Sequence, residues 1–148
     1  GLQGLPHRCQ KVQQFDWVSW YNDSKATNMG ATKAAIEGLA LEYEHIILLA
    51  GGQSKGQDFT ELSPVVQNNI THVVAFGEAR QALLAAWQGC CAVHLVDGLA
   101  EGVVMAKNLI QAYVKTAVVL SPACASFDQF QGFEDRGEAF VRCLNNQS

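Results

Sequence analysis

The chain has 148 residues and a mass of 16.0 kDa, the size of one domain large enough to bury a hydrophobic core. Apolar residues make up 49% and charged residues 16% of it, which excludes intrinsic disorder. The net charge of −4 argues against a nucleic-acid surface, and no apolar run approaches the ~18 residues of a membrane-spanning helix. We therefore expect one domain that binds neither nucleic acid nor membrane. We also expect a monomeric protein, and the cysteines described below favour the cytoplasm.

Short apolar segments alternate with helical patterns along the chain. In chain order, the pattern predicts a hairpin of strands 11–15 and 17–21, helix 30–41, strand 45–50, helix 59–68, strand 72–76, helix 79–88, strand 91–96, helix 99–113, strand 116–120 and helix 129–144. The hairpin turns at Asp16, Thr27 or Asn28 caps the first helix, and Asp58 caps the second. This order predicts an α/β fold with a doubly wound, mostly parallel sheet and helices on both faces.

The five cysteines form no Cys-x-x-Cys pair. Four of them lie in apolar segments: Cys90, Cys91, Cys124 and Cys143. We expect reduced, buried thiols rather than a disulfide framework or a zinc site. The first eight residues contain neither an initiating Met nor the apolar region of a signal peptide, which favours a segment excised from a longer protein.

Three loops that follow predicted strands contain polar and charged side chains. They span residues 23–28, 51–58 and 121–129. Ligands of a doubly wound sheet bind beyond the carboxyl ends of its strands, so we expect these loops to meet there. Lys25 and Lys55 supply positive charge, Thr27 and Ser126 supply hydroxyl groups, and the helix N-termini favour anions. The pattern predicts a site for a small dicarboxylate or part of a nucleotide; solvated lysines and ordinary helix caps are the alternative.

Two enzyme classes can be weighed on their motifs. Gly52-Gln53-Ser54-Lys55-Gly56 matches the nucleophile elbow of serine hydrolases, but the loop continues to Asp58 before a helix can start. The histidines available to such a serine, His72 and His94, lie within predicted strands. Neither a P-loop nor a Gly-x-Gly-x-x-Gly motif is present, so we do not expect this domain to hold a triphosphate by itself.

Two further features have a functional and an ordinary interpretation. Asp23, at a strand end, could accept hydrogen bonds from ribose hydroxyls or could cap a turn. His45, His72 and His94 are expected to be core or edge residues of the sheet, because no cluster of metal-ligating partners accompanies them.

Several segments, in this order, resemble the Mur ligase family in the branch that adds D-glutamate. They are Gly4-Leu5-Pro6-His7-Arg8, Asp23-Ser24-Lys25-Ala26-Thr27-Asn28 and the segment from Leu120 to Phe130, which is followed by Phe133-Glu134 and Arg136-Gly137. The resemblance covers the whole chain, residues 1–148, but only the C-terminal domain of such ligases. It implies a Rossmann-like fold and a parent protein with two preceding domains that are absent here.

The resemblance implies an ATP-dependent ligase that joins D-glutamate to UDP-N-acetylmuramoyl-L-alanine through an acyl phosphate in peptidoglycan synthesis. ATP and Mg²⁺ would be needed by the full-length enzyme. The family's phosphate-binding loop, Mg²⁺ ligands and uridine-nucleotide pocket belong to the preceding domains. We therefore expect no metal site in this chain and no ligation by the chain alone.

The resemblance also implies a role for individual residues. Lys55 and Thr27 would hold one carboxylate of D-glutamate. Ser126 and the backbone N–H groups of Phe133 and Phe127 would hold the other. Fixing both carboxylates would orient the amine and select one enantiomer.

The same resemblance implies an ATP-contacting group. Arg8 would reach a nucleotide phosphate, Asp23 the ribose, and Lys25 the acyl phosphate or the nucleotide phosphates. His7 would shape the hinge between domains. No residue of this chain is expected to transfer a proton, and Lys25 would contribute by charge stabilisation alone.

Two positions depart from the family pattern. Phe127 stands where Leu is familiar, and Gln53-Ser54 precedes Lys55 where the family often has Asp-Gly. Two other functions remain open at this point: a non-catalytic module that binds a nucleotide or a dicarboxylate, and a serine hydrolase that uses Ser54.

Overall fold

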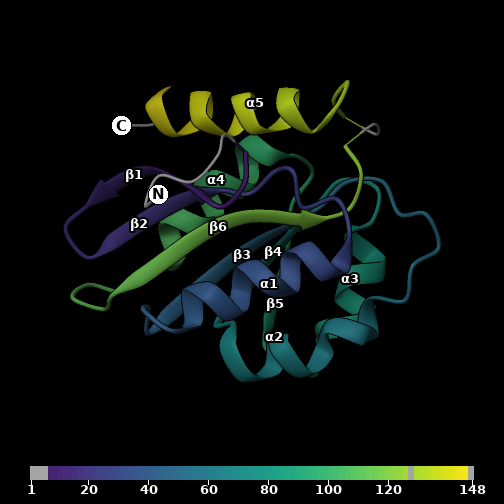
Figure 1. Cartoon of the computed structure of the whole chain (residues 1–148), viewed down its shortest axis with the longest axis horizontal. Helices are drawn as coiled ribbons and strands as arrows, with labels where there is room; N and C mark the ends of the chain where they lie inside the picture. The colour runs from purple at the N-terminus through teal and green to yellow at the C-terminus, as the bar shows by residue number, and fades with distance from the viewer. Residues whose placement is uncertain (1–6, 127–128, 147–148) are drawn as a thin grey trace.

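The computed structural model describes residues 7–126 and 129–146, which form a six-stranded sheet flanked by helices (Figure 1). The strands are β1 (Gln10–Phe15), β2 (Val18–Asn22), β3 (His45–Gly51), β4 (His72–Phe76), β5 (Ala92–Leu95) and β6 (Thr116–Ala123). The helices are α1 (Met29–Ala40), the 3₁₀ helix η1 (Phe59–Leu62), α2 (Ser63–Asn69), α3 (Arg80–Trp87), α4 (Leu99–Leu109) and α5 (Phe133–Asn146). The strand order is β1-β2-β6-β3-β4-β5, with β1 antiparallel to β2 and every other pair parallel. The predicted α/β fold is confirmed.

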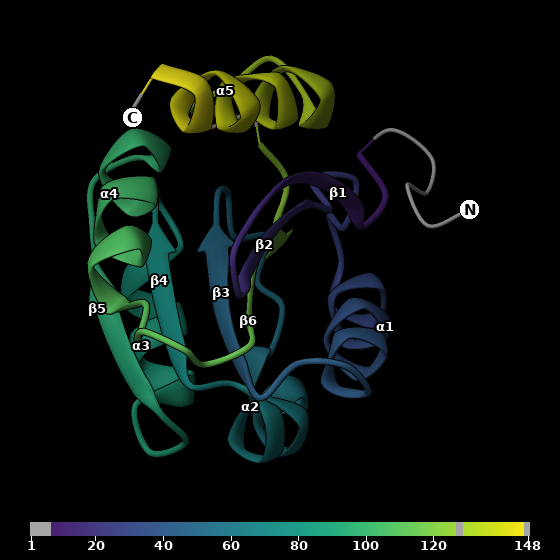
Figure 2. The ribbon, with the colours of Figure 1, turned by 90° about the vertical axis from the view of Figure 1, so that its left-hand side faces the viewer.

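The central strands are apolar along their length because helices cover both faces of the sheet (Figure 2). Ile46 and Leu48 of β3 point into a core shared with α1, α2 and α3. Ile47 and Leu49 of the same strand point into a second core shared with α4 and α5. Each core contains a fully buried aromatic side chain, Trp87 of α3 in the first and Phe140 of α5 in the second.

The predicted hairpin is the β1–β2 pair, which turns at Asp16 with φ +55°. Asp is one of the residues that tolerate this left-handed conformation, so the turn needs no glycine. The pairing has an irregularity between Lys11 and Gln13. The hairpin adds an antiparallel edge to an otherwise parallel sheet, and β2 itself is buried over its whole length.

Three predicted helices differ from the observed ones by more than a one-residue shift of their ends. The second begins as η1 and becomes α2 with Pro64 in its first turn, where a missing backbone N–H costs nothing. The fourth ends at Leu109 rather than residue 113, and Tyr113 adopts φ +68°. The last begins at Phe133 rather than residue 129, because Gln129 and Phe130 donate backbone hydrogen bonds to Ser126 and so belong to the preceding turn.

The five cysteines are all free thiols, as predicted, but the predicted burial is right for only one of the four cysteines concerned. Cys124 is buried, whereas Cys90, Cys91 and Cys143 are only partly covered. Cys90 and Cys91 lie in the connection between α3 and β5, and Cys143 lies three residues before the end of α5. An apolar sequence does not guarantee full burial at such positions. Across the described ranges, no helix has the length and apolar character needed to cross a bilayer.

Candidate functional site

The three loops that follow β2, β3 and β6 are joined by backbone hydrogen bonds at the carboxyl end of the sheet. Ala123 donates its N–H to the carbonyl of Ala26 at 2.9 Å, which links the loop after β6 to the loop after β2. Gln53 donates to the carbonyl of Ala125 at 2.8 Å, which links the loop after β3 to the loop after β6. The predicted convergence of these loops is confirmed, and their geometry is mutually dependent.

The loop after β2 leads directly into α1. Asn28 is the N-cap of that helix, with an extended backbone and a side-chain oxygen that accepts the N–H of Ala31 at 2.9 Å. Of the two predicted caps, Asn28 therefore fills the role. Thr27 is left partly buried, with its N–H bonded to the carbonyl of Lys25 at 2.8 Å, and the Lys25 side chain is exposed.

Asp23 is buried beneath this loop, with a 7% exposed side chain. Its Oδ1 accepts the backbone N–H of Cys9 at 2.9 Å, and its Oδ2 accepts the hydroxyl of Ser121 at 2.7 Å. Burial raises the pKa of Asp23 to about 6, although both hydrogen bonds act in the opposite direction. At neutral pH the group is therefore mainly a carboxylate, and each oxygen retains a lone pair for a further donor.

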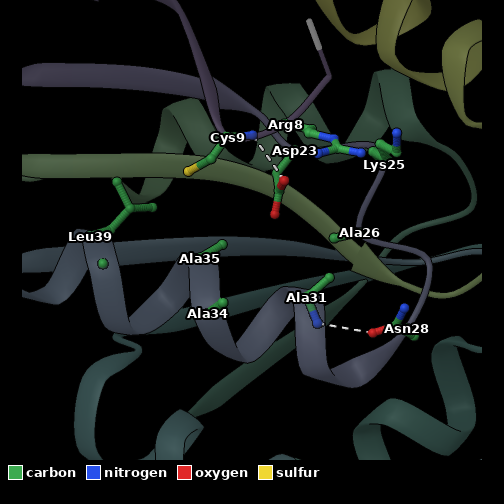
Figure 3. Close-up of a pocket in the computed structure, with 11 residues that line it drawn as sticks. Arg8, Cys9, Asp23, Lys25, Ala26, Asn28, Ala31, Ala34, Ala35 and Leu39 are labelled. Atoms are coloured by element: carbon green, nitrogen blue, oxygen red, sulfur yellow. Dashed lines mark hydrogen bonds between the residues drawn. The ribbon is translucent and has the colours of Figure 1, made fainter. Parts of the chain in front are cut away.

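A hollow of about 600 Å³ lies between the N-terminal segment and α1 (Figure 3). Its polar end is formed by Arg8, Asp23 and Lys25. The rest of its wall is mostly small or apolar: Cys9, Ala26, Asn28, Ala31, Ala34, Ala35, Gly38 and Leu39. Burial raises the pKa of the Cys9 thiol to about 12, so this side chain contributes as a neutral group. The hollow suits a ligand that has a flat, weakly polar part and an anionic or hydroxylated part.

His7, which precedes β1, contacts the loop after β2. Its carbonyl accepts the N–H of Lys25 at 3.0 Å, and its Nδ1 lies 3.1 Å from the Asn22 amide nitrogen and 3.2 Å from the Ser24 hydroxyl. The imidazole also meets the Phe133 ring edge-on, with a centroid distance of 6.1 Å. The Lys25 ammonium lies 5.8 Å from the centre of the same Phe133 ring. His7, Lys25 and Phe133 therefore form one cluster.

Lys55 projects from the loop after β3 with an exposed side chain. Its backbone N–H donates to Gln57 Oε1 at 2.6 Å, and Gln57 Nε2 donates to the carbonyl of Ala123 at 3.3 Å. The loop that contains the unusual Gln53-Ser54 sequence is therefore held in place. Gln53 and Gln57 both donate hydrogen bonds to carbonyls at the end of β6 and in the loop after it.

The structure contradicts the serine hydrolase interpretation, because Ser54 and His72 lie toward opposite ends of neighbouring parallel strands. Ser54 follows the carboxyl end of β3, whereas His72 is the first residue of β4 and pairs with Ile47 near the start of β3. His72 Nδ1 is hydrogen-bonded to His94 Nε2 at 3.1 Å, and the Ser54 hydroxyl lies 3.5 Å from Gln57 Oε1. Neither histidine can act as the base for this serine.

The segment after β6 contributes Ser126, whose side chain is 2% exposed. Its carbonyl accepts the N–H groups of Phe130 at 2.8 Å and Gln129 at 3.2 Å. Phe133 is the first residue of α5, a position whose N–H has no acceptor within the helix. Phe127 lies outside the described residues.

Sequence reasoning missed Arg136, a fully buried residue of α5. Its Nη2 donates to the carbonyl of Ser24 at 3.0 Å and its Nη1 to the carbonyl of Gly51 at 3.4 Å. The signal was present, because Arg136 falls on the same helical stripe as the buried Phe140 and Leu144. A charged residue on the buried face of an amphipathic helix is uncommon enough to be examined first.

The predicted residues thus fall into two groups. Arg8, Asp23 and Lys25 line one hollow, whereas Thr27, Lys55 and Ser126 lie on the three joined loops and do not line it. Within residues 7–126 and 129–146, no three His, Cys, Asp or Glu side chains are arranged to hold a metal ion.

Comparison with known proteins identifies the family. The profile of the Mur ligase glutamate ligase domain matches residues 7–124. The chain belongs to the Mur ligase family. That family uses ATP.

The Mur ligase domain described here is similar to UDP-N-acetylmuramoylalanine–D-glutamate ligases. It is 40% identical over 143 residues to the ligase of Pseudoalteromonas translucida, covering 97% of this chain and 31% of that protein. It is 46% identical over 142 residues to the ligase of Pseudomonas fluorescens, covering 95% of this chain and 31% of that protein. The chain therefore spans about a third of the length of these relatives.

Solved structures with the same fold are more distant in sequence. The folylpolyglutamate synthase/dihydrofolate synthase of Yersinia pestis has a TM-score of 0.68 and 12% identity, covering 95% of this chain and 32% of that one. The MurF ligase of Thermotoga maritima has a TM-score of 0.65 and 15% identity, covering 99% of this chain and 33% of that one. At these identities the likeness is one of fold.

Proposed function

We propose that the chain is the C-terminal domain of an ATP-dependent ligase that adds D-glutamate to UDP-N-acetylmuramoyl-L-alanine, a step of peptidoglycan precursor synthesis. The observation that carries this proposal is the 40–46% identity, over nearly the whole chain, to relatives named for that reaction. The relatives are about three times as long, so the chain would act together with further domains. The cell wall precursor would be held mostly by those domains.

The acceptor site for D-glutamate is proposed on the three joined loops. Lys55 and Thr27 would bind one carboxylate. Ser126 and the backbone N–H of Phe133, with that of Phe127, would bind the other. The arrangement supports this because a cation, hydroxyl groups and a helix N-terminus are all favourable partners for carboxylates. Two anchoring points on mutually bonded loops would fix the direction of the amine and so distinguish D-glutamate from L-glutamate.

The ATP-contacting site is proposed at the hollow beside α1. Arg8 and Lys25 would approach phosphate oxygens, and Asp23 would accept hydrogen bonds from the ribose. The small side chains of Ala31 and Ala34 would leave room for the base. Asp23 is well prepared for this role, since Cys9 and Ser121 fix both of its oxygens before any ligand arrives. Mg²⁺ would be held by residues of the other domains.

The chemistry proposed for the full-length enzyme is the one that its resemblance to the Mur ligases implies. The substrate carboxylate would attack the γ-phosphorus of ATP, releasing ADP and forming an acyl phosphate. The D-glutamate amine would then attack the acyl carbon, and the tetrahedral intermediate would expel phosphate as the amide forms. This domain would contribute by positioning the amine and by placing the charge of Lys25 near the transferred phosphoryl group. Closure of the domain would exclude water, which otherwise hydrolyses an acyl phosphate.

Amide-resolved NMR of this chain, titrated with D-glutamate and separately with L-glutamate, tests the proposed acceptor site. We expect D-glutamate, but not L-glutamate, to change the chemical shifts of the amides of Thr27, Lys55 and Phe133. The Lys55→Ala variant should lose the response, whereas Lys33→Ala, an exposed lysine of α1, should keep it. Equal responses to both enantiomers, or a response that survives Lys55→Ala, would contradict the proposal.

A further inference from the structure

Arg136 connects α5 to two of the site loops from inside the protein. Its side chain is 0% exposed, and its two terminal nitrogens reach different segments: Nη2 reaches the carbonyl of Ser24 and Nη1 reaches the carbonyl of Gly51. Ser24 immediately precedes Lys25, and Gly51 is the last residue of β3 before the loop that carries Lys55. One guanidinium therefore bridges the starts of both lysine-bearing loops.

The backbone around this guanidinium is packed too closely for ordinary side chains. A Cβ at Gly137 would collide with His7 Nδ1 and with the Ser24 hydroxyl, so α5 approaches the loop after β2 closely at this point. A Cβ at Gly52 would collide with the carbonyl of Ala125 and come within 2.9 Å of Arg136 Nη1, and Gly52 has φ +129°. The two glycines allow the helix and the loop after β3 to close around the guanidinium.

A guanidinium suits this place because of its shape. Its five N–H donors lie in one plane in a fixed fork, so it can bond to carbonyls of two separate segments at once. A lysine ammonium is a compact charge on a flexible stem and does not reproduce that fork. Burying a charged group is costly unless it is hydrogen-bonded, and the contacts to Ser24 and Gly51 offset part of that cost.

We propose that Arg136 is a positioning residue. It fixes the positions of the loop after β2 and the loop after β3 relative to the N-terminus of α5. Lys25 and Thr27 lie on the first loop, Lys55 lies on the second, and Phe133 begins the helix. If these loops bind D-glutamate, as in the proposed function on which this consequence rests, the Arg136 side chain would fix the distance between the two groups that bind its carboxylates. A preorganised site binds more tightly since less freedom is lost on binding.

The first test uses hydrogen exchange of the ligand-free chain, so it does not depend on the identity of the ligand. In Arg136→Lys, the amides of Lys25 and Gln53 should exchange about 10-fold faster or more, as expected when a hydrogen bond to a charged group is lost. The amides of Thr71 and Val96 serve as references, because they bond to the carbonyls of Ile46 and Ala75 away from Arg136.

Two further variants make the test decisive. Arg136→Gln removes the charge, so it gives the same readout even if a buried ammonium unfolds the chain. Arg142→Lys changes an exposed arginine of the same helix and should alter neither set of amides. Faster exchange at Lys25 and Gln53 with unchanged Thr71 and Val96 would support the proposal. Equal acceleration at all four amides, or none at any, would overturn it.

The second test concerns D-glutamate. Arg136→Lys and Arg136→Gln should weaken its apparent Kd about 10-fold or more, while Arg142→Lys should leave it unchanged. Undiminished affinity in a folded Arg136 variant would overturn the positioning role and leave the proposed function intact. A wild-type chain that gives no response to D-glutamate would instead overturn the proposed acceptor site, and the exchange pattern would still decide the role of Arg136.

Discussion

Replacing Asp23 with Asn tests the electrostatics beneath the loop after β2. In the native protein burial raises the pKa of this carboxyl group from its ordinary value of 3.8 to about 6. The folded state therefore favours the protonated form. The stability that this group contributes is fully present below pH 3.8 and is lost as the pH rises to about 6. Asn keeps the neutral shape at every pH: its oxygen can accept the Cys9 N–H, and its amide can donate to the Ser121 hydroxyl.

The magnitude follows from the size of the shift. Each pKa unit corresponds to 1.36 kcal/mol, so a displacement from 3.8 to about 6 is worth about 2 to 3 kcal/mol of unfolding free energy. Relative to the wild type, the Asn variant should gain that amount between pH 4 and pH 7. It should also bind ATP less well in the full-length enzyme, since an amide is a poorer acceptor for ribose hydroxyls than a carboxylate.

Urea unfolding of both proteins at pH 4, 5, 6 and 7 measures this effect as a difference, which cancels the contributions of the other carboxylates. Carbon-detected NMR of the Asp23 carboxyl group gives its pKa directly. A difference in unfolding free energy that does not change with pH would refute the reasoning. So would a wild type that becomes relatively more stable as the pH rises.

Three further predictions concern separate parts of the molecule. Gly52→Ala should lower the free energy of unfolding by roughly 2–4 kcal/mol, measured by thermal unfolding, because its Cβ would collide with Ala125. Gly56 has φ +78° but open space around it, so Gly56→Ala should lower that free energy by about 1 kcal/mol. Equal losses of stability in the two variants would contradict this. Burial and the neighbouring histidines lower the pKa of His72, so the stability it contributes is lost as the pH falls below 6.5; His72→Gln should weaken that loss in urea melts at pH 5 and pH 7, and an unchanged loss would count against it. Lys55→Ala should change the free energy of unfolding by less than about 0.5 kcal/mol, because the side chain is exposed, so a large loss of stability would show an unrecognised structural role.

Much of the fold was predictable because its signals are local. The run from His45 to Ala50 is continuously apolar and bounded by turn residues, and it forms the central strand β3. Since β2, β3 and β6 are parallel, their carboxyl ends share one edge, and the side chains Lys25, Lys55 and Ser126 come to that edge. The hairpin turn at Asp16 was also a local feature.

What could not be predicted depends on contacts between distant segments. The burial of Asp23 arises because Cys9 and Ser121, far apart in the sequence, close over it. Arg136 bonds to Ser24 across 112 positions, which no periodicity reveals. The start of α5 was misplaced because Gln129 is compatible with a helix but is used in a turn.

Transplanting this chain into a relative tests the central claim most directly. The corresponding third of the Pseudomonas fluorescens ligase, which is 46% identical to it, would be replaced by this chain, and phosphate release and product formation would be followed with D-glutamate or L-glutamate. We expect ligation that requires D-glutamate and that is lost in the Lys55→Ala version of the chimera. A folded chimera that forms no product with D-glutamate, or that uses L-glutamate equally well, would contradict the account.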